Sequence, residues 1–203
     1  MRKTIKRVGI CFLLAAFVWG GSLLLDRRTL NEELIRLHVV ANSDKAEEQK
    51  IKLQVRDVVL NSFQQELRNV SDMEGAKEYL RQNLPKIQAI ANDALRATGS
   101  GAEAAVTLCR EAFDTRVYDT FTLPAGVYES LRITIGAGEG KNWWCVVFPA
   151  LCMGATAEEF TDTAAGAGFS DGLNRALTAD ENTSIRFYFL DVMGKLENMF
   201  FEG

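Results

Sequence analysis

Hydrophobic and polar positions divide the chain into an apolar leader, a helical stretch and a stretch of short strands. In the leader, seven residues with four basic side chains and no acidic one precede an uncharged run from Val8 to Leu25. A basic start followed by an apolar run is typical of a segment that enters a translocon, with its basic end left inside. The run is long for a signal peptide and short for a membrane-spanning helix. We therefore expect residues 1–25 to act as a signal peptide or as a signal anchor.

Alternating side chains after the leader predict a half-buried strand. Ile35, Leu37 and Val39 share one face, whereas Arg36 and His38 share the other. This period of two is the pattern of a strand with one apolar face.

Two helices are expected next. Asp44, with Glu47 three residues later, resembles a capping box, and apolar residues then recur at helical spacing to about Leu67. A second amphipathic segment begins after Asp72, and Pro85 inside it predicts a kink or a restart.

The pattern returns to short strands after residue 101, with Pro124-Ala125-Gly126 placed as a tight turn. These elements predict an α+β fold: an N-terminal strand followed by two helices that pack on a small antiparallel sheet. The expected strands are residues 105–113, 118–123, 128–135 and 143–148.

The last part of the chain has a different composition. A stretch rich in Gly, Ala and Thr runs to about Gly168, and Ile185–Phe201 fits either a strand or a helix. We expect a leader at 1–25, an α+β signalling domain at 30–152, and a loosely packed, variable extension at 153–203 that is first flexible and then helical or strand.

Charge excludes one class of partner. The leader carries +4 and the whole chain −4, so the part after the leader is strongly acidic. Nucleic-acid binding relies on basic surfaces that neutralise phosphates. No nucleic-acid partner is expected, and the membrane is expected to be contacted only through residues 8–25, if they are retained.

Three features carry candidate chemistry. Gly136-x-Gly138-x-Gly140 resembles a nucleotide loop but runs into a β-like stretch instead of a helix, so a mobile hairpin loop is the better interpretation. His38, the single histidine, is expected to hydrogen-bond locally at the end of its strand. A zinc site would need His38 with Cys109, Cys145 and Cys152, and the spacing of the last two lacks a zinc knuckle, so we expect no metal and no cofactor.

Cysteine and tryptophan gather in one segment. Cys145 and Cys152 are disulfide candidates if the chain reverses between them, which would leave Cys109 as a buried thiol or an intermolecular partner. Trp143 and Trp144 point to opposite faces of a strand, so we expect one to fill the core and the other to be exposed as an anchor for a partner.

Several motifs, in order, resemble the stage II sporulation protein R family of endospore-forming Firmicutes over about residues 30–152. The residues that carry this resemblance are Ile35-Arg36-Leu37-His38-Val39-Val40-Ala41-Asn42-Ser43-Asp44, Gln49-x-x-Lys52-Leu53-x-Val55-Arg56-Asp57, Leu123-Pro124-Ala125-Gly126-x-Tyr128, Gly138-Glu139-Gly140-x-Asn142-Trp143-Trp144-Cys145 and Phe148-Pro149-x-Leu151-Cys152.

The resemblance implies a signalling protein rather than an enzyme. Members of that family are made in the forespore and exported into the space between forespore and mother cell. There they activate a membrane-embedded aspartic protease of the mother cell, which then cleaves pro-sigma-E. The implied location is this intermembrane space, or the forespore membrane if the leader is retained.

We expect the partner-binding surface to comprise His38, Asn42, Ser43, Asp44, Trp143 and Trp144. A structural interpretation competes with this one: Asn42, Ser43 and Asp44 only cap the helix, and Arg56 and Asp57 form a solvated pair. Two functional alternatives also stay open. One is an exported hydrolase of cell-wall or peptide substrates that uses His38 with Asp44 or Asp57, and the other is a plain anchored structural protein.

Overall fold

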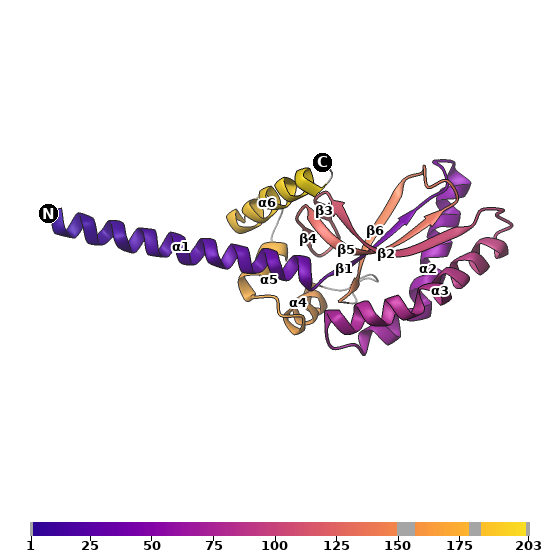
Figure 1. The fold of residues 1–203 in the computed structure, drawn as a ribbon, viewed down its shortest axis with the longest axis horizontal. Helices are drawn as coiled ribbons and strands as arrows, with labels where there is room; N and C mark the ends of the chain where they lie inside the picture. The colour runs from indigo at the N-terminus through magenta and orange to yellow at the C-terminus, as the bar shows by residue number, and fades with distance from the viewer. Residues whose placement is uncertain (1, 150–156, 179–183, 202–203) are drawn as a thin grey trace.

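The computed structural model describes residues 2–149, 157–178 and 184–201. Within these residues it has the α+β fold that the sequence predicts, with a four-stranded sheet and a two-stranded sheet. The elements are α1 (Arg2–Glu32), β1 (Ile35–Val40), α2 (Ala46–Arg68), α3 (Met73–Ala97), β2 (Ala104–Phe113), β3 (Arg116–Val117), β4 (Thr122–Leu123), β5 (Gly126–Ile135), β6 (Asn142–Phe148), α4 (Ala157–Gly166), α5 (Asp171–Thr178) and α6 (Ile185–Phe201). Figure 1 shows α1 projecting from one end of the molecule, with α4, α5 and α6 near its base.

The four-stranded sheet has the order β2-β5-β1-β6, and one of its pairings is parallel rather than antiparallel. β1 runs antiparallel to β6 but parallel to β5, with Leu37 opposite Leu131. The reason is the connection: the chain leaves β1 through α2 and α3, enters the sheet edge as β2, and turns back as β5 beside β1. A long helical crossover allows parallel neighbours, which a hairpin cannot join.

One face of the sheet packs against α2 and α3 through a continuous apolar core. Ile35, Leu37 and Val39 enter this core from β1, as their alternation predicts, and Val55 and Phe63 enter it from α2. Burial of large apolar side chains of this kind stabilises the fold by about 1.5–3 kcal/mol each.

Helix α3 begins where the sequence predicts but does not restart at its proline. Asp72 caps α3, since its side chain accepts a hydrogen bond of 2.8 Å from the N–H of Gly75. Helix α3 then continues through Pro85 without a restart, and the side chain of Asn83, two residues before Pro85, donates a hydrogen bond of 2.8 Å to the carbonyl of Tyr79.

The opposite face of β1 is also covered, so β1 is not a half-buried strand. Arg36 is fully buried there. Its guanidinium lies 4.0 Å from the ring centroid of Phe113 and donates a hydrogen bond of 2.7 Å to the hydroxyl of Tyr118. Period-two alternation predicted which side chains share this face but not that other elements cover it.

The C-terminal segment supplies part of that cover. Its described residues form α4, α5 and α6, and Phe160, Leu173 and Leu190 from these helices are fully buried in a second apolar cluster. The expectation of loose packing therefore does not hold for these helices, and the ambiguous run at Ile185–Phe201 is a helix.

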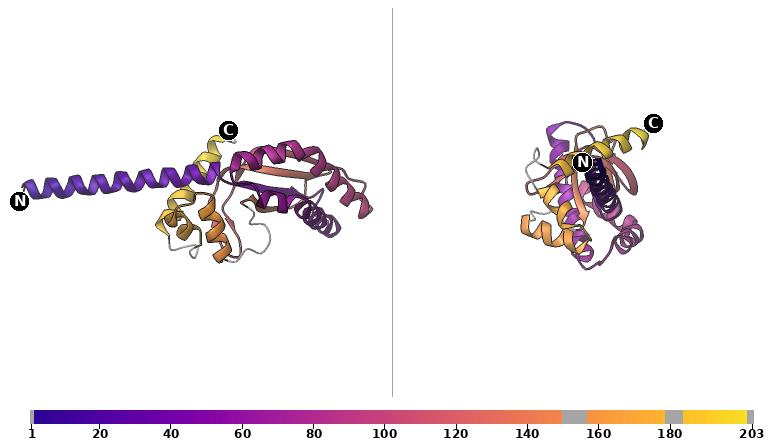
Figure 2. Two further views of the ribbon diagram at one scale, coloured as in Figure 1. Left: turned by 90° about the horizontal axis from the view of Figure 1, so that it is seen from below. Right: turned by 90° about the vertical axis from the view of Figure 1, so that its left-hand side faces the viewer.

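Helix α1 belongs partly to the folded body. It runs without a break past residue 25, and Leu23 and Leu30 are buried in the second cluster. Within the described residues, Thr4–Glu32 is the one helix long and apolar enough to cross a membrane. In the left-hand view of Figure 2 this helix extends well beyond the body, and the right-hand view looks along it.

Candidate functional site

Two loops meet at the end of the molecule opposite α1 (Figure 1). Residues 41–44 lie in the connection from β1 to α2, and residues 136–141 connect β5 to β6. We call these residues together the corner surface. Because β5 and β6 flank β1 in the sheet, residues 136–141 cross over the end of β1 and are not the hairpin loop expected from the sequence.

Hydrogen bonds fasten the glycine-rich loop to the corner. The side-chain oxygen of Asn42 accepts a bond of 2.9 Å from the N–H of Ala137. The carbonyl of Ala41 accepts one of 2.9 Å from the N–H of Gly140. Bonds of this kind tie the two loops together, so the interpretation of a mobile loop is replaced by that of a held one.

Asp44 joins the same connection instead of capping α2. Its Oδ1 accepts a hydrogen bond of 2.6 Å from the N–H of Lys141. Lys45 occupies the cap position of α2, where no side-chain cap bond forms. The predicted capping box is therefore wrong, and Asp44 connects the corner to the glycine-rich loop.

The glycines allow the close approach of the two loops. Gly136 has φ +55°, and a Cβ there would meet the side chain of Asn42. A Cβ on Gly140 would overlap the carbonyl of Ser43. These positions need glycine for contact with another loop, not with a phosphate.

Lys52 and Gln49 support the corner surface from α2, a role that the sequence did not predict. Lys52 is 5% exposed, and its Nζ donates to the carbonyl of Lys141 and to Oε1 of Gln49, both at 2.8 Å. Gln49 in turn donates to the carbonyl of Ser43 at 2.9 Å. Burial, together with the nearby charge of Arg56, lowers the pKa of Lys52. The signal in the sequence that could have indicated this role is that Lys52 stands among the apolar positions of an amphipathic helix.

His38 lies away from the corner surface, on the covered second face of the sheet. Its Nδ1 lies 3.1 Å from Oε1 of Glu111, 73 residues away in sequence, so its hydrogen bond is not local. Arg132 donates to the same carboxylate oxygen at 2.9 Å. Burial acts to raise the pKa of Glu111, but the hydrogen bond from His38, with smaller contributions from Ser130 and from the charge of Arg132, outweighs it, and the pKa is lowered.

The arrangement does not assemble the proposed hydrolase. The carboxylate beside His38 belongs to Glu111. Asp44 binds the loop backbone, and Asp57 pairs with Arg56 on α2. Within the described residues, no group of three or more His, Cys, Asp or Glu is placed to hold a metal ion.

Trp143 and Trp144 are half-buried, and each is covered by an arginine, so neither is the exposed anchor that the sequence predicted. Trp143 lies on the α2 side of the sheet, with Arg56 4.5 Å from a ring centroid. Trp144 lies on the other side, stacked on His38, with Arg116 3.6 Å from a ring centroid. Arg56 therefore covers Trp143 in addition to pairing with Asp57.

The cysteines show two states. Cys145 is buried and disulfide-bonded, whereas Cys11 and Cys109 are free thiols. Cys152 lies outside the described residues, so the pairing of Cys145 with Cys152 stays a prediction.

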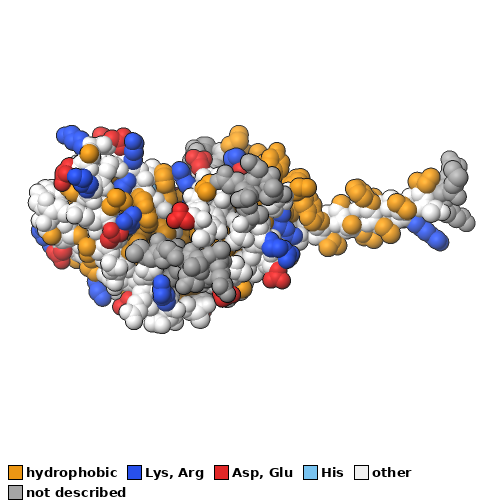
Figure 3. Space-filling model, turned by 180° about the vertical axis from the view of Figure 1, so that it is seen from behind, with side chains coloured by type: hydrophobic (Ala, Val, Ile, Leu, Met, Phe, Trp, Pro, Cys, Tyr) orange, Lys and Arg blue, Asp and Glu red, His pale blue; other side chains and the backbone are white. Residues whose placement is uncertain are grey.

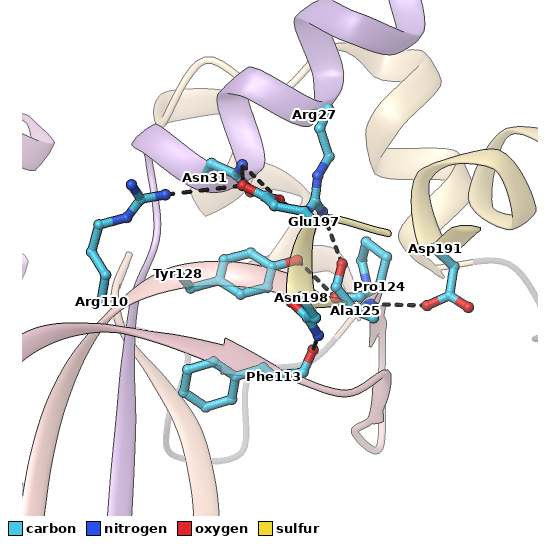
Figure 4. A network of polar contacts seen from close by, with 10 residues as sticks. All are labelled: Arg27, Asn31, Arg110, Phe113, Pro124, Ala125, Tyr128, Asp191, Glu197 and Asn198. Carbon is cyan, nitrogen blue, oxygen red and sulfur yellow. Dashed lines mark hydrogen bonds and ion pairs between the residues drawn. The ribbon is translucent and has the colours of Figure 1, made fainter. Parts of the chain in front are cut away.

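A second polar cluster, which sequence reasoning missed, joins α1 to α6 (Figure 4). Arg27 pairs with Glu197 and also donates to the carbonyl of Ala125 at 2.9 Å. Asp191 accepts a bond of 2.9 Å from the N–H of Ala125. Gly194 lies so close to Ala125 that a Cβ would overlap its carbonyl. We call these contacts the α1–α6 joint.

The joint gives the turn at Pro124-Ala125-Gly126 a structural role. A Cβ on Gly126, whose φ is +155°, would overlap the guanidinium of Arg27. Tyr128 is fully buried and donates to the carbonyl of Pro124 at 2.8 Å. No local pattern links these residues to α6, which lies about 65 residues further along the chain, so no sequence signal marked the joint.

Comparison with known proteins agrees with the motifs quoted above. The family model described as stage II sporulation protein R matches residues 31–158. A curated relative, stage II sporulation protein R of Bacillus subtilis (strain 168), is 37% identical over 122 residues, which cover 60% of this chain and 54% of the relative. The chain thus matches about half of that relative's length. No solved structure matches significantly.

Proposed function

The chain belongs to the stage II sporulation protein R family, and from that premise we propose that it is an intercellular signal. It is exported from the forespore and activates a membrane-embedded aspartic protease of the mother cell, which then cleaves pro-sigma-E. The protein acts as a ligand of the protease and performs no catalysis itself.

The position of the corner surface carries this proposal. It lies at the end of the body opposite α1 (Figure 1). With α1 in the forespore membrane, the corner surface is directed away from that membrane and toward the facing one, where the protease resides. Its backbone is held by bonds from Asn42, Asp44 and Lys52, so a partner meets a preformed surface.

We propose that α1 is an anchor that stays in the membrane. Residues at its C-terminal end are built into the fold: Asp26 pairs with Arg186 and accepts from Ser170, and Leu30 is fully buried. Peptidase cleavage after residue 25 would remove Leu23 from the second cluster and Ser22 from Arg186. These contacts favour retention of the segment over its removal.

Reconstitution tests the function. The full chain, the protease and pro-sigma-E are produced together in a non-sporulating host, and the size of pro-sigma-E is followed by immunoblot. We expect cleavage only when all three proteins are present, and a chain without residues 1–21 is expected to fold but not to signal, because it is not exported. No cleavage by an exported, folded full chain would contradict the proposal. The mass of the exported chain tests retention of α1 separately.

The hydrolase alternative has a direct test as well. Purified protein is expected to release no product from cell-wall material or peptides. A His38→Ala variant that folds is expected to keep signalling, because His38 lies away from the corner surface.

A further inference from the structure

Helix α6 exposes apolar side chains close to the membrane segment. Ile185 and Tyr188, in its first turns, are 69% and 65% exposed, and Phe189 is 42% exposed. The inner side of the same helix is buried through Phe187 and Leu190. The first two turns of α6 are therefore apolar on the side that covers the body and also on the outer side.

The exposed part of α6 is continuous with α1. The rings of Trp19 and Phe189 meet edge to face, with centroids 5.3 Å apart. Arg186 pairs with Asp26 and donates to the hydroxyl of Ser22 at 3.0 Å. Figure 3 shows hydrophobic side chains gathered where α1 enters the body. One apolar surface thus runs from α1 onto the first turns of α6.

Charges near this surface are arranged for a membrane boundary. Arg186 and Asp26 neutralise each other in an ion pair whose side chains are largely buried. Leu24 and Leu25 are exposed just before them, whereas the exposed pair of Arg28 and Glu32 follows on α1. Tryptophan and tyrosine are enriched at the level of the lipid headgroups, and here the rings of Trp19 and Tyr188 both contact the ring of Phe189.

We propose that the first two turns of α6 rest in the interfacial layer of the membrane that holds α1. The exposed side chains of these turns then contact lipid at the boundary between the headgroups and the acyl chains. Helix α6 does not cross the bilayer, because Asp191 and Glu197 further along it are bound to the body by Ala125 and Arg27. The inference rests on the proposed retention of α1 in the membrane.

A second membrane contact fixes orientation. A body attached through one helix rotates about its attachment, whereas attachment through α1 and the start of α6, joined by Asp26 and Arg186, restricts that rotation. The corner surface is then held away from the forespore membrane. This role of α6 differs from the protein contact proposed for residues 41–44 and 136–141.

Photo-cross-linking of the full chain in lipid nanodiscs tests the proposal. The photoreactive residue p-benzoylphenylalanine replaces one residue at a time: Tyr188 on α6, Leu14 in α1 as the anchor control, and Val58 on α2 as an exposed control remote from α1. Melting of each purified variant checks folding, and mass spectrometry identifies what each probe has labelled.

We expect lipid adducts at positions 14 and 188 and none above background at position 58. Lipid adducts at 14 without any at 188 would overturn the α6 contact and leave the anchor standing. Adducts between position 188 and a protein would assign this face to a protein partner and also overturn the proposal. Absence of lipid adducts at 14 would overturn the anchor and with it the inference.

Discussion

The two faces of the central sheet are both buried, but by different means. On the α2 and α3 side, Leu37 is surrounded by an uninterrupted apolar core. On the other side its neighbour Arg36 is equally buried, among Phe113, Tyr118 and Tyr128. The first face is closed by helices that follow β1 directly, and the second by α1 and the C-terminal helices. The first face is closed by an apolar core, whereas the second combines an apolar cluster with the polar contacts that position α1.

The largest expected effect is on the first face. Leu37→Ala removes a fully buried side chain and leaves a cavity, so we expect the free energy of unfolding to fall by about 2–5 kcal/mol. Urea denaturation of the purified chain in detergent measures it. A loss no larger than that of an exposed substitution such as Val58→Ala would contradict the described core.

The next largest effect on stability is expected at the α1–α6 joint. Gly194→Ala forces a Cβ onto the carbonyl of Ala125, and we expect a loss of about 1–3 kcal/mol. Gly166→Ala on α4 is the matched control, because nothing lies within 4 Å of its added Cβ. That control is expected to be neutral or to stabilise by up to about 1 kcal/mol. Equal melting temperatures for the two variants would show that α6 does not dock as described.

Acid is expected to weaken the second face. The pKa of Glu111 is lowered in the folded chain, as is that of Asp191, where bonds from Ala125 and Lys195 outweigh burial. A carboxyl whose folded pKa lies below its unfolded value contributes stability above the unfolded pKa and loses it as the pH falls through the folded value. We therefore expect the melting temperature to fall as the pH drops below the ordinary pKa range of carboxyl groups. Glu111→Gln is expected to flatten this slope of melting temperature against pH.

The control for this titration is Glu78→Gln, at an exposed position of α3. It is expected to leave the slope unchanged. If Glu111→Gln leaves the slope unaltered, the carboxylate of Glu111 does not contribute to the acid sensitivity, which contradicts this prediction.

The smallest effect is expected at the buried cation. The Nε and Nη1 groups of Arg36 have no hydrogen-bond partner among the described residues. Replacing a poorly paired buried charge with an apolar side chain of similar size is often nearly neutral, so we expect Arg36→Met to change stability by less than about 1.5 kcal/mol. A loss of about 3–5 kcal/mol would instead indicate a well-paired buried charge.

Local patterns predicted the first face well. The apolar residues of β1 and of the two helices after it have strict periods, and Ile35, Val55 and Phe63 lie where those periods place them. The parallel pairing of β1 with β5 was not predictable in this way, because it depends on where β2 enters the sheet. Periodicity reports which face a residue occupies, but not which strand lies beside it.

The candidate site was predicted only in part. Asn42, Ser43 and Asp44 do belong to the corner surface, and Trp143 follows it, but His38 and Trp144 lie on the second face. Asp44 was expected to cap a helix because a capping box is a local pattern, whereas its actual partner is the N–H of Lys141, 97 residues away. Long-range hydrogen bonds of this kind leave no periodic trace in a sequence.

Charge reversal on the corner surface tests the central claim most directly. Glu139 and Lys141 have exposed side chains, and only their backbone groups make the bonds that hold the loop, so Glu139→Lys and Lys141→Glu are expected to fold normally. In the reconstituted system we expect each to lower pro-sigma-E cleavage about tenfold at unchanged melting temperature, as the loss of about 1.4 kcal/mol of binding would. Lys86→Glu, at an exposed site on α3, is expected to signal like the unaltered chain. Full cleavage by both loop variants would contradict the account.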